Sequence, residues 1–290
     1  GPLTFCSITI QRADGESPLG IRNLTSDERA AQLIPGGINI MVKPEPQGLN
    51  RYNHLYQWML IPMVAMQIGI FVDYWGDFSE NGWPVHVHYW TATLWYLFLI
   101  LNPYFAAKRQ FEHHRTYGII GFFLAGGVAM TAFSALNRDT TNAALAAETP
   151  GRFGPFEAWF FYGITAVEFV MMSAFVFAVI QSIRYRRSLH DHAWWLISTV
   201  FIIMMPSVGR GVGLAWPLYF GNDDPRVTTW PLYLTTGLII ALLLWAARRY
   251  GRINHPATWL AIGANLFNLL VEPLGKWPWL QGVLHAMIKT

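Results

Sequence analysis

The stretch "WPLYLTTGLIIALLLWAARRYGRINH", residues 230–255, contains the pattern that the rest of the chain repeats. Residues 230–247 are almost wholly apolar and carry no charge, and a helix that crosses a bilayer needs about 20 such residues. Arginines follow at once, and His255 stands where the next apolar run begins. The pattern indicates a membrane-spanning helix with a basic end.

The same length criterion gives seven candidate spans along the chain. They cover residues 55–74, 88–107, 117–136, 156–183, 193–214, 230–247 and 256–271. These runs lack the alternation of barrel strands, and a helix satisfies its own backbone in lipid. We therefore predict an all-α fold, a polytopic transmembrane helix bundle with about seven spans. The segment after Trp277 is too short to cross and is expected to lie along the interface.

Composition supports a lipid bilayer as the first partner. Only 13% of the 290 residues are charged, against about 25% in a soluble domain. The 14 tryptophans suit a protein with two lipid–water interfaces, where amphipathic rings collect. The single Cys6 excludes a disulfide within the chain and a thiolate zinc cluster.

Charge alternates from one connector to the next. The connectors after spans two, four and six read "KRQFEHHR", "RYRRSLHDH" and "RRYGRINH", whereas the others read "DYWGDFSEN", "NRDTTNAALAAETPGR" and "FGNDDPR". The positive-inside rule places the basic set in the cytoplasm. We predict a multi-pass protein of the bacterial inner (plasma) membrane with a cytoplasmic amino terminus. Because the basic residues lie in short loops between spans, membrane orientation explains them and no nucleic-acid partner is expected.

Two regions are predicted. Residues 1–50 are polar and read as a cytoplasmic N-terminal tail, in which Gly1 and Pro2 are interpreted as a possible tag remnant. Residues 51–290 form the transmembrane domain.

Histidines gather at the cytoplasmic ends of the odd-numbered spans. Six of the nine stand there, namely His54, His113, His114, His190, His192 and His255. Imidazole is the commonest side-chain ligand for zinc, copper and iron, including haem iron. We predict metal ligands among His113, His114, His190 and His192, with iron, copper or zinc as the metal. The alternative is that each imidazole simply titrates in the headgroup region beside arginines.

Two ionisable residues lie at membrane depth. Glu168 is near the middle of span four and Arg210 is in the outer half of span five. Such residues are costly in lipid and are usually functional, so both are candidate catalytic residues or part of a proton or substrate path. The alternative is a buried pair that only fixes helix packing. Pro206 and the nearby glycines are expected to loosen span five.

Polar residues in other spans extend this picture. Asn265, Asn268 and Glu272 share one face of span seven, and Asn137, Arg138 and Asp139 end span three. Together they predict a polar interior that opens outward.

Two longer segments carry a family resemblance. "HYWTATLWYLFLILNPYFAAKRQFEHHRTYG" and "YRRSLHDHAWWLISTVFIIMMPSVGR" together resemble uncharacterised bacterial polytopic membrane proteins whose helical core is similar to cytochrome b561-type units. The resemblance implies haem b held by paired histidines on neighbouring helices, with His88, His114 and His192 at the matching positions. His54 is a further cofactor-binding candidate because it shares the cytoplasmic level.

These observations lead to one main functional expectation and its alternatives. The first is a membrane oxidoreductase that binds a metal ion or haem b and acts on a small or lipid-soluble, quinone-like substrate. The second is a non-enzymatic carrier or sensor with an outward-opening polar cavity, and the third is an accessory subunit with membrane-complex partners. The tightly spaced "HVH", "EHH" and "HDH" also keep a diiron oxygenase open.

Overall fold

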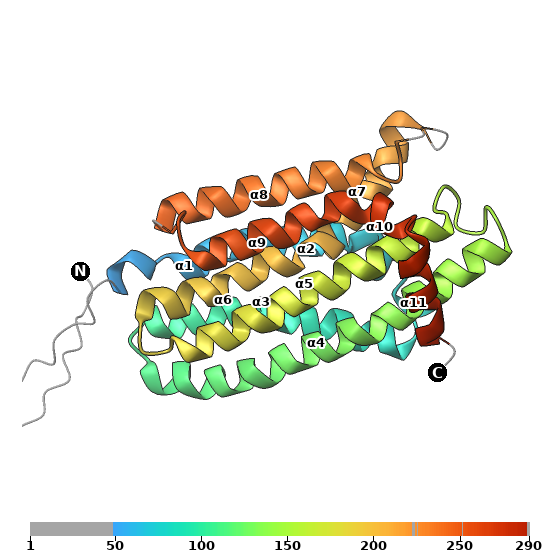
Figure 1. The fold of residues 1–290 in the computed structure, drawn as a ribbon. Coiled ribbons are helices and arrows are strands. Elements are labelled where there is room, and N and C mark those ends of the chain that lie inside the picture. The colour runs from blue at the N-terminus through green and yellow to red at the C-terminus, as the bar shows by residue number, and fades with distance from the viewer. Residues whose placement is uncertain (1–48, 222–223, 225, 251, 289–290) are drawn as a thin grey trace, which may run out of the picture. The chain divides into compact units, whose positions relative to one another are not determined.

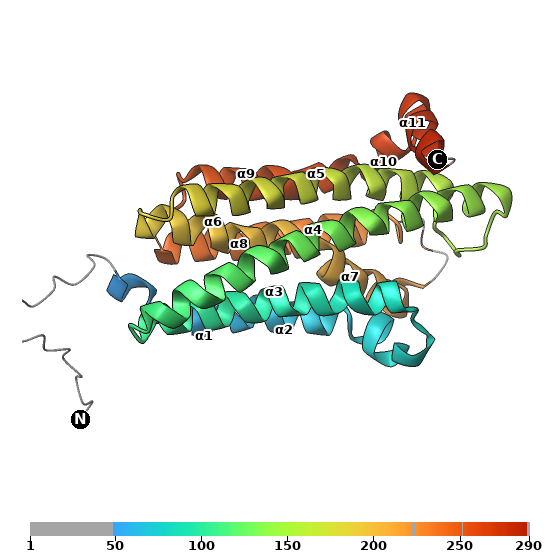
Figure 2. The ribbon, with the colours of Figure 1, turned by 90° about the horizontal axis from the view of Figure 1, so that it is seen from below.

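A computed structural model describes residues 49–221, 224, 226–250 and 252–288, and every regular element in them is a helix. The all-α prediction is confirmed for this part of the chain, and the predicted tail lies almost entirely outside it. Long helices run side by side as a bundle (Figures 1 and 2). They are α3 (Trp83–Ala107), α4 (Phe111–Glu148), α5 (Ala158–Arg184), α6 (Leu189–Ile203), α7 (Met205–Phe220), α8 (Trp230–Tyr250) and α9 (Pro256–Leu266).

Shorter helices complete the bundle. They are η1 (Leu49–Tyr52), α1 (Leu55–Trp58), α2 (Leu60–Gly69), the π-helix η2 (Phe71–Gly76), η3 (Phe78–Glu80), η4 (Phe267–Leu270), α10 (Val271–Gly275) and α11 (Pro278–Ile288). The final helix runs across the others rather than along them (Figure 2). Its location at a membrane interface stays a prediction. Its Leu284 is buried against Ala143 and Tyr162.

Five helical segments of the described chain are long and apolar enough to cross a membrane, so the predicted count of seven is not confirmed. They are Phe111–Glu148, Ala158–Arg184, Leu189–Phe220, Trp230–Tyr250 and Pro256–Gly275. The second predicted span forms α3, which is 25 residues long but lies outside this set. Its two histidines, threonines and Asn102 make it more polar than the others.

The first predicted span, 55–74, is broken into α1, α2 and η2. Proline has no N–H and its ring clashes with the carbonyl four residues earlier, which for Pro62 is the carbonyl of Trp58. Helix α1 ends at Trp58 for this reason. None of the three pieces is long enough to cross a bilayer alone.

The fifth predicted span is also interrupted, as its proline suggested. Helix α6 ends at Ile203 and α7 begins at Met205, with Pro206 in its first turn. Helix α2 crosses α7 with its backbone in contact, because a side chain at Gly211 would lie 2.8 Å from the Cα of Gly69. The expected close approach of another backbone is therefore confirmed.

Helix α4 is longer than predicted. The third span was expected to end at residue 136, followed by an irregular outer connector, but α4 continues to Glu148. Its 38 residues correspond to about 57 Å, well beyond a hydrocarbon core of about 30 Å. The outer part is stabilised by packing, since Asp139, Thr140 and Ala143 are buried.

The charge asymmetry of the connectors coincides with the two ends of the bundle. The α3–α4, α5–α6 and α8–α9 connectors lie together at one end, and the α4–α5 and α7–α8 connectors lie at the other (Figure 1). We call the first the basic end and the second the acidic end.

Candidate ligand-binding cavity and the histidine end

The six predicted histidines share one end of the bundle. They lie at or next to the starts of α1, α4, α6 and α9, which are all at the basic end (Figure 1). The prediction that they gather at one end of the helices is confirmed, whereas their level in a membrane stays a prediction. Their side chains, however, have different partners.

Four of these histidines have separate local contacts. The His54 side chain forms a hydrogen bond with Gln57 at 3.0 Å, and His113 stacks on Phe105 with ring centroids 5.5 Å apart. His190 forms a hydrogen bond with the Tyr52 hydroxyl at 3.1 Å. His255 forms one with Asp191 at 3.3 Å. Burial lowers the pKa of His255 and raises the pKa of Tyr52. These contacts fasten η1 and the start of α9 to α6.

His114 and His192 form a pair across α4 and α6. Their ring centroids are 6.3 Å apart and the rings are nearly perpendicular, at 83°. Each Nδ1 lies beside a backbone carbonyl, that of Asn102 at 3.1 Å and that of Ser182 at 2.8 Å. Because a carbonyl only accepts, both Nδ1 atoms carry a proton, and in the neutral form of each ring Nε2 has the lone pair.

The larger predicted cluster does not form among the described residues, where no group of three or more His, Cys, Asp or Glu converges to hold a metal ion. His88, the fourth candidate for haem, is near the start of α3 at the acidic end and bonds Thr131 at 3.2 Å. The four cofactor candidates are therefore not brought to one place. Binding of a metal ion or haem stays a prediction. Of the predicted ligands on different helices, only His114 and His192 lie close to each other in the described part of the chain.

A cavity of about 80 Å³ lies toward the acidic end of the bundle. Most of its wall is apolar, with Met66, Ile70 and Met171 among the lining residues. A volume of about 10–15 Å³ in this measure already holds one water molecule. The cavity therefore has room for several waters or a small organic molecule.

Charged and polar side chains line the same cavity, and both predicted interior residues are among them. They are His88, Tyr89, Arg138, Glu168, Ser207 and Arg210. They come from α3, α4, α5 and α7, so the tertiary fold gathers residues that are far apart in sequence. Of the residues predicted to form a polar interior, Arg138, Glu168 and Arg210 line this cavity, whose wall is otherwise mostly apolar.

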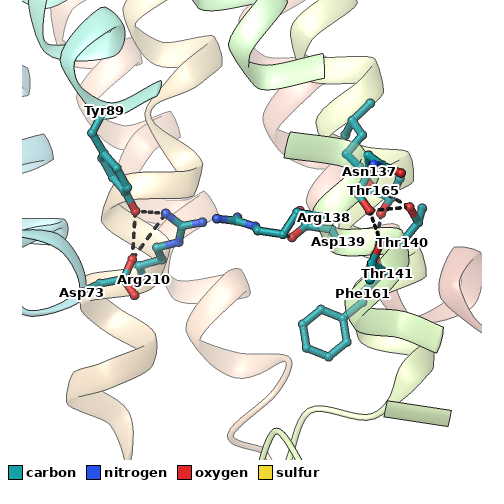
Figure 3. A network of polar contacts seen from close by, with 11 residues as sticks. Asp73, Tyr89, Asn137, Arg138, Asp139, Thr140, Thr141, Phe161, Thr165 and Arg210 are labelled. Carbon is teal, nitrogen blue, oxygen red and sulfur yellow. Dashed lines mark hydrogen bonds and ion pairs between the residues drawn. The ribbon is translucent and has the colours of Figure 1, made fainter. Parts of the chain in front are cut away.

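The ion pair of Arg210 is made with Asp73 rather than with Glu168. The Arg210 Nη1 lies 3.4 Å from an Asp73 carboxylate oxygen, and the Tyr89 hydroxyl donates to the same oxygen at 2.9 Å. Arg210 also donates to the Tyr89 hydroxyl through Nη1 (Figure 3). Asp73 can reach Arg210 because η2 brings it back against the bundle. The sequence predicted Asp73 in an outer connector.

A second charged group lies on α4 and α5. Arg138 pairs with Asp139 at 3.4 Å, and the carboxyl of Asp139 is within hydrogen-bonding reach of Glu168. The cavity is therefore lined by the guanidinium groups of Arg138 and Arg210 and by the carboxyl group of Glu168, and Asp139 lies beside Glu168.

The polar residues of the seventh predicted span do not line this cavity. The Asn265 amide donates to the carbonyls of Phe201 and Ala261, at 2.9 and 2.8 Å, and Asn268 donates to Asn265 at 2.8 Å. Glu272 pairs with Lys276 at 2.6 Å near the end of α10. These residues connect α9 to α6 and accompany the 3₁₀ turn η4.

Sequence reasoning missed Asp73 and Tyr89 as the partners of Arg210. Asp73 follows an apolar run directly, and Tyr89 adjoins His88. Neither position carries a spacing that distinguishes it from an ordinary interfacial residue.

Comparison with known proteins adds no assignment. No family model matches the chain, and there is no significant match to a curated protein or to a solved structure. The resemblance to cytochrome b561-type units therefore receives no support from these comparisons.

Proposed function

We propose that this chain is a non-enzymatic membrane carrier or sensor that binds a small molecule in the cavity between α2, α3, α4, α5 and α7. The single observation that carries this proposal is the cavity itself, in which Glu168, Arg138 and Arg210 meet inside an otherwise apolar wall. Ionisable side chains at membrane depth are costly and mark ligand or ion pathways. A Glu168–Arg210 pair that only fixed the packing of the helices would not need a cavity beside it.

The proposed setting is a bacterial inner membrane with the basic end in the cytoplasm. Lys108, Arg109, Arg186, Arg187 and Arg252 lie in connectors of that end, and positive-inside asymmetry supports this orientation. The cavity then lies toward the outer side. Asp73 and Arg138 have side chains that are 42% and 45% exposed, which supports access from the outer side.

The test is a thermal-shift screen of the purified full-length protein against a panel of small metabolites. We expect at least one compound to raise the unfolding temperature of the wild type and to lose this effect in Glu168→Gln and Arg210→Ala. Glu272→Gln and Arg152→Ala are matched controls, because Glu272 pairs with Lys276 outside the cavity and Arg152 is exposed in the α4–α5 connector. A panel without any stabilising compound, or compounds that act equally on all variants, would contradict the proposal.

A second candidate function rests on the His114–His192 pair. Imidazole is the commonest side-chain ligand for iron, copper and zinc, and the two rings lie with their centroids 6.3 Å apart. A ligating histidine usually donates its other N–H to a carbonyl or carboxylate, as both rings do here. We propose this pair as the site of a metal ion or haem iron, which when bound would supply redox chemistry toward a quinone-like substrate.

Elemental analysis and a visible spectrum test the second candidate. Iron, copper or zinc, or a Soret band, should be present in the wild type and absent in His114→Ala and His192→Ala. His54→Ala is the control, because His54 bonds only its neighbour Gln57 among the described residues. Metal-free wild type without a Soret band would end this candidate.

A further inference from the structure

Two positively charged side chains face each other across the cavity. The guanidinium groups of Arg138, from α4, and Arg210, from α7, point toward one another (Figure 3), and both residues line the cavity. Like charges repel, and water weakens the repulsion only in part, because the side chains of Arg138 and Arg210 are 45% and 31% exposed. Such an arrangement is stabilised when an anion lies between the two groups.

Both arginines have guanidinium N–H groups that the contacts described above do not use. Within the described part of the chain, the contacts of Arg210 use only Nη1, and the contact of Arg138 with a carboxylate uses only Nε. A guanidinium has five N–H donors in a planar fork that matches the two oxygens of a carboxylate. The Nη2 of Arg210 and both terminal nitrogens of Arg138 are available to a ligand.

The rest of the cavity wall indicates the chemistry of the part of the ligand that carries the anionic group. Met66, Ile70 and Met171 offer an apolar surface next to the two arginines. A bare inorganic anion would leave this surface in contact with water, whereas a short hydrocarbon chain would cover it. The shape and the chemistry both suit an acid with a short apolar body.

We propose that the ligand is a small monocarboxylate that binds between Arg138 and Arg210 together with a proton. This proposal rests on the function proposed above and names its ligand class. The carboxylate replaces Asp139 as the partner of Arg138, and the proton goes to the carboxyl group of Asp139, which then lies beside Glu168 without its arginine partner.

Charge balance is the reason for the proton. The three carboxyl groups of Asp73, Asp139 and Glu168 already outnumber the two guanidinium groups of Arg138 and Arg210. An added anion without a proton would increase the excess negative charge in the interior, which is costly. The titratable and charged groups that face Asp139 and Glu168 are Asp73 on η2, His88 and Tyr89 on α3, Arg138 on α4 and Arg210 on α7.

The test compares butyrate with butyramide, a neutral molecule of the same size, on the purified full-length protein. Binding is measured by equilibrium dialysis and proton uptake in weakly buffered solution. We expect butyrate to bind at least about tenfold more tightly than butyramide, with about one proton taken up for each butyrate bound. Chloride should not compete, because it cannot cover the apolar wall.

Variants separate the anion from the proton. Arg138→Gln should lose at least about tenfold in butyrate affinity, and Arg210→Lys should lose affinity because it keeps the charge but not the planar fork. Asp139→Asn keeps Glu168 and removes the carboxyl group proposed to take up the proton, so butyrate should still bind but with reduced proton uptake. Size-exclusion chromatography checks that each variant is folded.

Equal affinity for butyrate and butyramide, butyrate binding without proton uptake, or unchanged affinity in Arg138→Gln would each overturn this inference. The carrier or sensor function would survive those results if the metabolite screen finds another ligand. A screen in which no compound binds would overturn both.

Discussion

At the scale of single residues, Tyr89 holds the position of Arg210. Its hydroxyl donates to Asp73 at 2.9 Å and accepts from Arg210, and the guanidinium carbon lies 5.7 Å from the centre of the ring. The aromatic ring and the hydroxyl together direct the guanidinium into the cavity. Tyr89 is therefore a positioning residue.

Tyr89→Phe should lower the free energy of unfolding by about 1–2 kcal/mol, because hydrogen bonds to charged groups contribute about 1.5–3 kcal/mol and water can partly replace the hydroxyl at Asp73, whose side chain is 42% exposed. Unfolding in detergent monitored by circular dichroism measures this. Tyr233→Phe, at a position that is 38% exposed, is the control and should change little. Equal stability of Tyr89→Phe and wild type would remove the positioning role.

His255 caps α9 and makes stability depend on pH. Its Nδ1 accepts the Ala257 N–H at 3.1 Å, so the ring proton is on Nε2, which faces Asp191 at 3.3 Å. Burial holds the pKa of His255 below its usual value, which is about 6.5. When the pH falls below that value, the unfolded chain binds the proton first, so this group lowers stability as the pH decreases.

We expect the unfolding temperature of the wild type to fall more between about pH 8 and about pH 5, a range that brackets the ordinary histidine pKa, than that of His255→Asn. Asparagine is a good N-cap that does not titrate in this range. Thermal unfolding at several pH values gives the comparison. Parallel pH profiles of the two proteins would show that His255 does not contribute.

At the scale of elements, glycines decide how closely α5 and α10 approach. A side chain at Gly163 would lie 2.1 Å from the Val271 carbonyl oxygen, and one at Gly275 would lie 1.9 Å from that of Trp159. Small residues at such crossings let membrane helices pack with their backbones in contact. This crossing places the end of α10 against the start of α5.

Gly163→Ala should destabilise the protein by about 1–3 kcal/mol, the usual cost of overpacking. Gly126→Ala is the matched control, because Gly126 is also inside a helix and nothing lies within 4 Å of the added atom. The control should be neutral or more stable by up to about 1 kcal/mol, since alanine favours helix. Denaturant unfolding of both variants gives the comparison, and similar values for the two would contradict the proposed close packing.

The ends of the helices show which structural features can be predicted from the local sequence. Pro206 predicted the interruption between α6 and α7, because a missing N–H acts wherever the proline lies. The continuation of α4 to Glu148 was not predictable in this way. Residues 137–142 are polar, whereas residues 143–148 read "AALAAE" and are good helix formers. Contacts of Ala143 with Tyr162 of α5 and Leu284 of α11 stabilise this part of the helix further.

At the scale of the whole molecule, the separation of basic and acidic connectors predicts a fixed orientation. Arg187 lies in the α5–α6 connector at the basic end, and Ala147 is exposed near the end of α4 at the acidic end. The positive-inside rule places the first in the cytoplasm.

Single cysteines at these two positions, in a Cys6→Ser background, test the orientation with a membrane-impermeant maleimide. Ala147→Cys should be labelled in intact bacterial cells, whereas Arg187→Cys should be labelled only after the cells are permeabilised. The opposite pattern would reverse the orientation, and labelling of both positions in intact cells would contradict a membrane barrier between them.

The sequence by itself determined the helical class, the apolar segments, the gathering of six histidines at one end of the helices and the presence of Glu168 and Arg210 inside the bundle. These follow from properties of contiguous residues, because hydropathy, charge and proline act locally. Only the tertiary structure decided that Asp73 pairs with Arg210, that Arg138 faces it, and that His114 meets His192 while the other predicted histidines find separate partners. Those contacts depend on which helices lie side by side, and long-range packing is not encoded in the spacing of any one segment.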